Sequence, residues 1–167
     1  MLPTGMLASG DEKGEIKLWT IDTGSLAQTL KGHTGGINDL ALVNNDQMLA
    51  SSSHDKTVRL WDFRTGAAIR VLSGHTDYVE GLKAISSTLM ASASDDRTIK
   101  IWDSTNGALV KTLTGHTDSI VWSLDLLSES VLVSGSLDKT IKLWNVSSGQ
   151  VNETIQANMA IQCLIVI

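Results

Sequence analysis

Histidine, serine and aspartate recur together in this chain of 167 residues, and the three residue types together can form a nucleophilic catalytic triad. Gly-His-Thr occurs three times, with the histidines at His33, His75 and His116. About twenty residues after each histidine stands a Ser-x-Asp motif, at 53–55, 94–96 and 136–138. Because one active site would not occur three times in a chain, we expect these groups to hold the fold together rather than to catalyse a reaction.

Other landmarks of the chain keep the same spacing. The four tryptophans that follow a basic residue and an apolar one are separated by 42, 41 and 42 residues, and four glycines repeat at the same intervals. These landmarks are Trp19, Trp61, Trp102 and Trp144, and Gly24, Gly66, Gly107 and Gly149. A period of this length corresponds to one supersecondary unit, so the chain is built of four repeats.

Each repeat contains the pattern of a β-strand. The segments "IKLW", "VRLW", "IKIW" and "IKLW", which end at the four tryptophans, alternate apolar with basic residues, as strands do. A glycine-containing turn follows each segment and leads to a further strand. Two more apolar segments precede the tryptophan strand in the later units, and the only proline is Pro3. We therefore expect an all-β chain with four short antiparallel strands per unit.

Composition excludes several classes of function. The chain is 42% hydrophobic and 19% charged, which is typical of a globular protein. Its net charge of −5 offers no basic surface, so we expect no nucleic-acid partner. The apolar terminal segment "AIQCLIVI" is much shorter than a membrane-spanning helix, so we expect no membrane partner. Cys163 is the only cysteine, which fits a reducing compartment and predicts an intracellular, cytoplasmic or nuclear protein.

The segment "GHTGGINDLALVNNDQMLASSSHDKTVRLWD", from Gly32 to Asp62, resembles a repeat of the WD-repeat β-propellers, and the next two units match equally well. The resemblance covers the whole chain and implies a propeller of four-stranded antiparallel blades. Residues 1–167 then form a single region with four repeats. Its parts are the last three strands of blade 1 (1–31), blade 2 (32–73), blade 3 (74–114), blade 4 (115–156) and the first strand of a closing blade (157–167).

The resemblance also implies a role for the recurring polar residues, as a hydrogen-bonded group of four inside each blade, called the tetrad below. The three expected tetrads are His33, Ser53, Asp55 and Trp61; His75, Ser94, Asp96 and Trp102; and His116, Ser136, Asp138 and Trp144. A nucleophilic serine needs an exposed position, whereas these serines belong to apolar strands. The histidines have no second histidine or cysteine two or four residues away. We therefore expect no catalytic residue, no metal site and no cofactor.

The two ends of the chain are complementary, so that the terminal blade is split between them. If Met1 followed Ile167, the distance from Trp144 to Trp19 across the join would be 42 residues. In that composite blade Asn158, Asp11 and Lys13 would occupy the positions of His, Ser and Asp. Three outcomes stay open: a four-bladed ring, two chains joined as an eight-bladed ring, or an excerpt from a longer propeller. Unpaired strand edges favour the last two over a four-bladed monomer.

In this family, recognition takes place on the top face, which is formed by the loops before the first strand and after the second strand of each blade. The candidate partner-binding residues there are His54, Asp95 and Leu137 before the tetrad aspartates, Gly36, Asp77, Tyr78 and Ser119 after the histidines, and Trp122, which lies outside the periodic set. Tyr78 is the best single candidate, because aromatic residues contribute much of the binding energy at protein interfaces. Trp122 either lines the upper channel or fills a gap between blades.

These observations predict a non-catalytic interaction module that binds a protein or peptide on its top face. Two alternatives stay open, a purely structural unit that assembles with a second copy into an eight-bladed ring, and an excerpt of a larger WD-repeat protein. An enzyme that uses His54 with Asp95 or Asp77 is the weakest alternative. The sequence identifies neither the partner and its pathway nor the number of blades in the closed ring, nor any fused domain.

Overall fold

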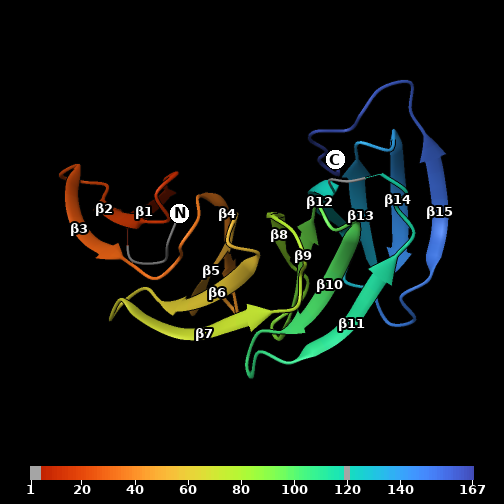
Figure 1. Ribbon diagram of the computed structural model, residues 1–167. Helices are drawn as coiled ribbons and strands as arrows, with labels where there is room; N and C mark the ends of the chain where they lie inside the picture. Colours follow the sequence, from red (N-terminus) through yellow and green to blue (C-terminus); the bar gives the residue numbers. More distant parts are fainter. Residues whose placement is uncertain (1–4, 119–120) are drawn as a thin grey trace.

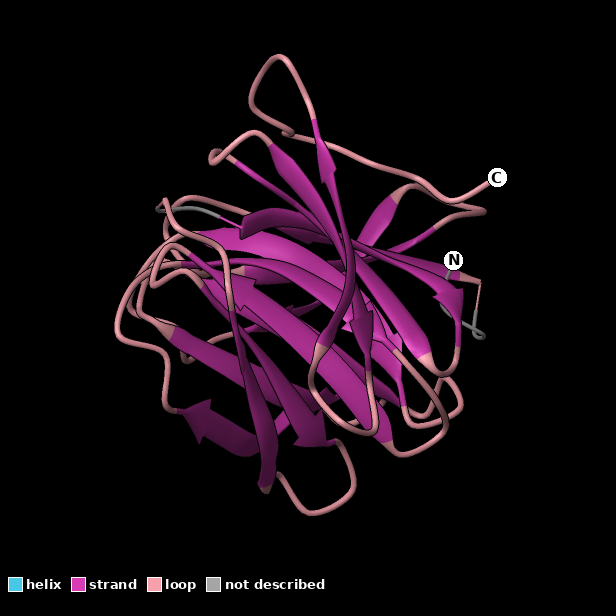
Figure 2. Ribbon diagram, turned by 90° about the vertical axis from the view of Figure 1, so that its right-hand side faces the viewer, coloured by secondary structure: helices cyan, strands magenta, loops and turns pink. Residues whose placement is uncertain are grey.

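The computed structural model describes residues 5–118 and 121–167, and in these residues every regular element is a strand (Figures 1 and 2). The strands are β1 (Met6–Gly10), β2 (Ile16–Thr20), β3 (Ser25–Leu30), β4 (Ile37–Val43), β5 (Met48–Ser53), β6 (Thr57–Asp62), β7 (Ala67–Ser73), β8 (Val79–Ala84), β9 (Leu89–Ser94), β10 (Thr98–Asp103), β11 (Leu109–Thr114), β12 (Val121–Ser128), β13 (Val131–Ser136), β14 (Thr140–Asn145) and β15 (Val151–Gln156). None of the described residues belongs to a helix long and apolar enough to cross a membrane.

The strands form four antiparallel sheets, each made of consecutive strands. The first sheet has three strands in the order β1-β2-β3, and the other three sheets have four strands each, β4 to β7, β8 to β11 and β12 to β15. Figure 1 shows the sheets following one another along a curved arc, with β4, β8 and β12 on its inner side and β7, β11 and β15 on its outer side. The predicted all-β architecture of repeated antiparallel blades is therefore confirmed.

The core lies between neighbouring sheets. The strands carry apolar side chains on both faces, so both faces of a sheet can be buried against its neighbours. One cluster joins the first two sheets and includes Ile16, Leu18 and Trp61, all of them fully buried. Two further clusters join the second sheet to the third and the third to the fourth. The basic residues that alternate with them, such as Lys17 and Arg59, are half-buried. The two-residue period of the sequence therefore sets how each blade packs.

The turn between the second and third strands of each complete blade needs a residue in the left-handed conformation. Lys56, Arg97 and Lys139 take this place, with φ of 69°, 70° and 66°. This conformation is unfavourable for residues with a Cβ, and it persists here because the turn is tied to the strands on both sides. The turn residues are part of the same short loop as the tetrad aspartates, so their geometry fixes where those carboxylates lie.

The two ends of the arc differ from its middle. Strand β1 pairs with β2 on one side only, so its other edge is open in the described residues. Residues 157–167, predicted as the first strand of a closing blade, form no regular strand and lie against the fourth sheet. The Ile161 amide donates to the Ser136 carbonyl at 3.0 Å, and the Leu164 amide donates to Ser123 Oγ at 3.1 Å. In Figure 1, β1 and this segment lie on opposite sides of the opening, and their pairing stays a prediction.

Candidate functional site

The polar group of the second sheet is built from the loop before β4, strand β5, the turn after it and strand β6. His33 Nδ1 lies 2.7 Å from Asp55 Oδ2, and His33 Nε2 lies 2.7 Å from Ser51 Oγ. The indole Nε1 of Trp61 donates to the same Ser51 Oγ at 2.8 Å. Since the carboxylate accepts from Nδ1–H, Nε2 accepts the serine proton and the serine oxygen accepts from the indole. Each ring nitrogen and the serine hydroxyl therefore has a partner.

The third and fourth sheets repeat this arrangement. His75 joins Asp96 at 2.7 Å and Ser92 at 2.8 Å, and His116 joins Asp138 and Ser134 at the same distances. Trp102 and Trp144 donate to those serines at 2.8 Å. In these buried tetrads each histidine ring nitrogen and each serine hydroxyl has a hydrogen-bond partner, which favours this one packing of the blade over others.

The serine assignment made from the sequence is wrong by two residues in every blade. The hydrogen bonds go to Ser51, Ser92 and Ser134, not to Ser53, Ser94 and Ser136. Both serines of each pair point to one face of the strand, so alternation does not separate them. The register of β5 with β6 distinguishes the two serines. Ser51 lies opposite Arg59, two residues from Trp61, whereas Ser53 is about 7 Å farther along the strand.

Ser53 instead holds the turn. Its hydroxyl donates to the Gly35 carbonyl at 2.9 Å and accepts from the Asp55 amide at 3.0 Å. The equivalent Ser94 donates to the carbonyl of Asp77 at 3.2 Å and accepts from the Asp96 amide at 3.1 Å. These serines therefore connect the turn after the second strand to the loop before the first strand, which are the two loops of the top face.

The first sheet also departs from the assignment made from the sequence. Trp19 Nε1 donates to Ser9 Oγ at 2.9 Å, so Ser9 and not Asp11 takes the serine position there. Asp11 accepts hydrogen bonds from the amides of Lys13 and Glu15, both at 3.0 Å, and pairs with Lys17 Nζ at 3.0 Å. The first sheet therefore keeps the contact between tryptophan and serine but holds its turn by an ion pair on the surface.

In the second and fourth sheets, the surroundings lower the pKa of both the tetrad aspartate and the tetrad histidine. Burial alone would raise the pKa of Asp55, but hydrogen bonds from Thr57, His33 and the Thr34 amide outweigh it and lower the pKa to about 2. Asp138 has a pKa of about 2 for the same reasons, with Thr140 and His116 as donors. Burial lowers the pKa of His33 and His116 against the opposing effect of their aspartates. Only a neutral imidazole can accept the serine proton at Nε2 while it donates from Nδ1.

This geometry resembles a catalytic triad but cannot act as one in the folded chain. Ser51, Ser92 and Ser134 are fully buried, so no substrate carbonyl can reach their oxygens. Each oxygen also accepts an indole N–H, which engages one of its two lone pairs and holds the hydroxyl in place. The tetrads therefore stabilise the blades, and a functional site must be sought on the surface.

Such a surface lies where the second and third sheets meet on the top face, and we name it the rim cluster: His54, Asp77, Tyr78, Glu80 and Asp95. The rings of His54 and Tyr78 are stacked, with centroids 4.3 Å apart and an interplanar angle of 24°. The Asp95 amide donates to the Tyr78 carbonyl at 3.0 Å, which joins the turn after β9 to the loop before β8. Tyr78 is 42% exposed.

The rim cluster carries more negative charge than it can neutralise. Burial raises the pKa of Asp95, and the nearby Asp77 and Asp96 raise it further, whereas His54 lowers it. Burial also raises the pKa of Glu80, with Asp95 and Asp77 adding to the shift. Lys56 lies 3.7 Å from Asp77, and Asp95 Oδ1 is buried without a hydrogen-bond partner. A cation placed beside Tyr78 would relieve this repulsion.

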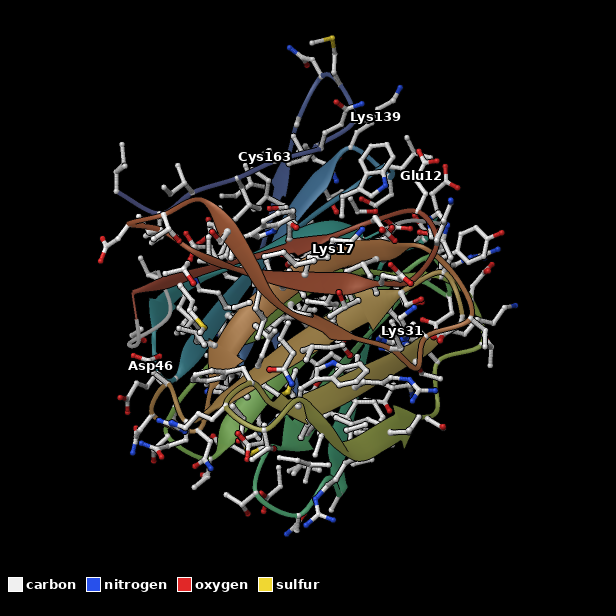
Figure 3. All side chains as sticks on the ribbon, turned by 90° about the vertical axis from the view of Figure 1, so that its left-hand side faces the viewer. Glu12, Lys17, Lys31, Asp46, Lys139 and Cys163 are labelled. Atoms are coloured by element: carbon white, nitrogen blue, oxygen red, sulfur yellow. The ribbon has the colours of Figure 1, made fainter. Side chains whose placement is uncertain are left out.

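The other predicted top-face residues are arranged differently. The Gly36 carbonyl accepts from the His54 amide at 2.9 Å, so Gly36 supports the rim cluster from below. Leu137 in the turn before Asp138 and Trp122 on β12 are both half-buried in the fourth sheet. Ser119 lies outside the described residues. Figure 3 shows Glu12 and Lys139, from the corresponding turns of the first and fourth sheets, on one side of the molecule and Asp46 on the opposite side.

Three kinds of residue were missed at the sequence level. Thr57, Thr98 and Thr140 each donate to their tetrad aspartate at 2.6 Å, and the recurring Asp-Lys/Arg-Thr motif would have indicated them. The serines two residues before the chosen ones were visible as the repeated Ser-x-Ser-x-Asp motif. Glu80 carried no such signal, because only the fold brings it beside Asp95. Among residues 5–118 and 121–167, no three His, Cys, Asp or Glu side chains are arranged to hold a metal ion.

Comparison with known proteins gives consistent similarities. The family model "WD domain, G-beta repeat" (WD40) matches residues 24–62, 66–103 and 107–145. A Lissencephaly-1 homolog of Caenorhabditis briggsae is 49% identical over 37 residues, and that of Monosiga brevicollis is 44% identical over 36 residues. Each match covers 22% of this chain, and 10% and 9% of the two relatives, so the match spans about a tenth of their length.

A similar solved structure is the WD40 β-propeller domain of Doa1, with a TM-score of 0.83 and 29% sequence identity. The match covers 95% of this chain and 53% of that chain. The four sheets described above therefore follow the path of about half of that propeller domain.

Proposed function

Since the chain belongs to the WD40 repeat family of β-propellers, whose domains generally act as protein-interaction scaffolds, we propose that it is a non-catalytic module that binds a protein or peptide partner through its top face. The three matched repeats cover more than half of the chain. The lone cysteine supports a reducing, intracellular location as part of the same proposal.

The rim cluster is the observation that carries this proposal. It presents an exposed, stacked aromatic pair beside three carboxylates, one of which has a buried oxygen without a partner. A lysine or arginine side chain of a partner would lie against the Tyr78 ring and donate to Asp95. The partner expected on these grounds is a protein segment with an exposed basic residue.

Partner capture tests the proposal. The chain is immobilised, and captured proteins are compared between the wild type and the Tyr78→Ala and Asp95→Ala variants. Leu127→Ala is the matched control, because Leu127 is an exposed apolar residue at the end of β12, away from the rim cluster. We expect both rim variants to lose a partner that the control retains. Equal capture by all four proteins would refute the top-face assignment.

Self-association is a second proposed property, favoured by one observation. The chain covers 53% of a similar propeller domain, so a closed ring of that kind needs about as many blades again. A second copy of the chain would supply them as a homodimer with eight blades. Light scattering combined with size exclusion, against a monomer mass of 17.9 kDa, measures this directly.

A further inference from the structure

The residue two places after the tryptophan follows the third strand of each complete sheet. Phe63, Ser104 and Val146 occupy this position. The Ser104 amide donates to the Thr88 carbonyl at 2.8 Å, and the Val146 amide donates to the Ser130 carbonyl at 2.9 Å, so the main chain takes the same path in the third and fourth sheets. Phe63 packs in the core cluster between the first and second sheets, and Val146 packs in the cluster between the third and fourth. The two side chains therefore have equivalent places in two interfaces.

The two interfaces are filled to different extents at this place. Phe63 is 1% exposed and Ser104 is fully buried, so neither borders open space. Val146, whose side chain is smaller than that of phenylalanine, is only half-buried. A groove of about 470 Å³ opens beside it. The interface between the third and fourth sheets therefore lacks the ring that Phe63 supplies between the first and second.

The groove has an apolar base and a charged residue at each end. Its apolar lining consists of Ile85, Leu89, Ile101, Val110 and Val146. Ile85 and Ile101 are at most 4% exposed and form the base, whereas Val110 is 51% exposed. Lys111 lies on β11, on the outer side of the arc, and Glu129 follows from β12, on its inner side (Figure 1). The groove therefore runs from a positive outer end to a negative inner end.

The lysine at the outer end is held in place by the neighbouring sheet. Lys111 Nζ donates to the Ser147 carbonyl, as the Gln28 side chain donates to the Thr65 carbonyl at 3.0 Å between the first and second sheets. This bond uses one of the three N–H groups of the ammonium, which can also donate to a carboxylate above the groove. The charge at this end is therefore fixed in position and can select an acidic neighbour.

We propose that the groove between the third and fourth sheets binds a phenylalanine side chain of a partner protein segment, with an acidic residue of that segment beside Lys111 and a basic residue beside Glu129. The chain itself shows that such a ring fits, because Phe63 fills the equivalent place with its ring fully packed. Aromatic rings also bury a large apolar area, and grooves of about 300–1,000 Å³ with an apolar base and a few polar groups are typical ligand sites.

This surface is separate from the rim cluster. The groove is bordered by the turns that join the first and second strands, at Ser86 and Ser130, and by Ser147 after a third strand. The rim cluster lies at the opposite ends of the strands, where the loops of the top face meet. The groove therefore offers the module a second contact that does not depend on partner binding at the top face.

Peptide binding to the whole chain tests the proposal. The probes are fluorescent peptides with a central phenylalanine between a lysine and a glutamate, in both orders of the two charges, and the same peptides with alanine at the centre. Fluorescence anisotropy measures affinity, and methyl NMR signals of Ile85 and Ile101 report where the peptide binds. We expect one phenylalanine peptide to bind and to shift both signals, and the alanine peptides to do neither.

Val146→Phe places the chain's own ring in the groove, as Phe63 does in its interface. We expect it to weaken binding by at least about tenfold and to raise the urea midpoint, because the groove is filled. Val146→Ala is the matched control, since it leaves the groove open and should bind. Lys111→Gln, which keeps the side-chain bond in the form that Gln28 has, should weaken binding severalfold, most at low salt.

The remaining outcomes overturn the proposal. They are the absence of binding to the wild type, equal binding by Val146→Phe, and a lowered urea midpoint of Val146→Phe, which would show that the ring does not fit. Tyr78→Ala should bind these peptides as the wild type does. Loss of binding in that variant, with unchanged Ile85 and Ile101 signals, would place the peptide at the rim cluster instead.

Discussion

Replacing Ser51 with alanine tests the role assigned to the tetrads. The change removes the hydroxyl that accepts from Trp61 Nε1 at 2.8 Å and lies 2.7 Å from His33 Nε2. Two buried polar groups then lose their partners, at about 1–3 kcal/mol each, so we expect a loss of about 2–6 kcal/mol in the free energy of unfolding. Ser53→Ala removes a hydroxyl that is also fully buried, but its partners, Gly35 and Asp55, are only half-buried, and we expect a loss of about 0.5–2 kcal/mol.

The assay is urea unfolding followed by circular dichroism, arranged as two double-mutant cycles with Trp61→Phe. Ser51 and Trp61 share a hydrogen bond, so their cycle should give a coupling of about 1–2 kcal/mol, whereas Ser53 and Trp61 should give a coupling near zero. Ser92 with Trp102 in the third sheet provides an independent repeat of the first cycle. Coupling of Trp61 to Ser53 instead of Ser51 would refute the assignment of the tetrad serine.

Three further predictions concern pH and the turns. The pKa of His33 is lower in the folded chain than in the unfolded chain, so its stabilising contribution is complete above the unfolded value near 6.5 and is lost as the pH falls. The same holds for Asp55 around its unfolded value of 3.8. The urea midpoint should therefore fall from pH 7 to 5 and again from pH 4 to 2, and a midpoint that does not change with pH would contradict the lowered pKa values. Arg97→Gly relieves a φ of 70° and should raise the free energy of unfolding by about 0.5–1 kcal/mol in urea titrations, and a decrease would show that the turn is unstrained. Gly35→Ala places a Cβ 2.7 Å from the Asp55 amide and should cost about 1–3 kcal/mol in the same assay, an expectation that an unchanged midpoint would overturn.

Periodicity was sufficient to predict the blades. The spacing of the tryptophans and glycines fixes the repeat, and alternation around Trp61 fixes the strands, so these features need no tertiary information. The tetrad serine was not fixed in this way, because Ser51 and Ser53 share a face and differ only in distance along the strand. That distance depends on the register with β6, which alternation does not specify.

The rim cluster was predictable only in part. Tyr78, Asp77, His54 and Asp95 followed from their places next to the tetrad residues. The stacking of His54 on Tyr78 and the approach of Glu80 depend on how two neighbouring sheets meet, which no local pattern encodes. The open edge of β1 was expected from the incomplete first unit, whereas the exposure of Leu7, whose counterpart Leu49 is buried against the neighbouring sheet, became visible only in the structure.

The most direct test of the proposed function is a titration with charged peptides. Two fluorescent peptides of equal length, one with a central arginine pair and one with glutamine at those places, are titrated with the wild type and with Tyr78→Ala at low and moderate salt. We expect the arginine peptide to bind more tightly, to weaken with salt, and to lose about tenfold in affinity with Tyr78→Ala, which is about 1.4 kcal/mol. Equal affinity for both peptides, or no effect of Tyr78→Ala, would contradict recognition of a basic partner by the rim cluster.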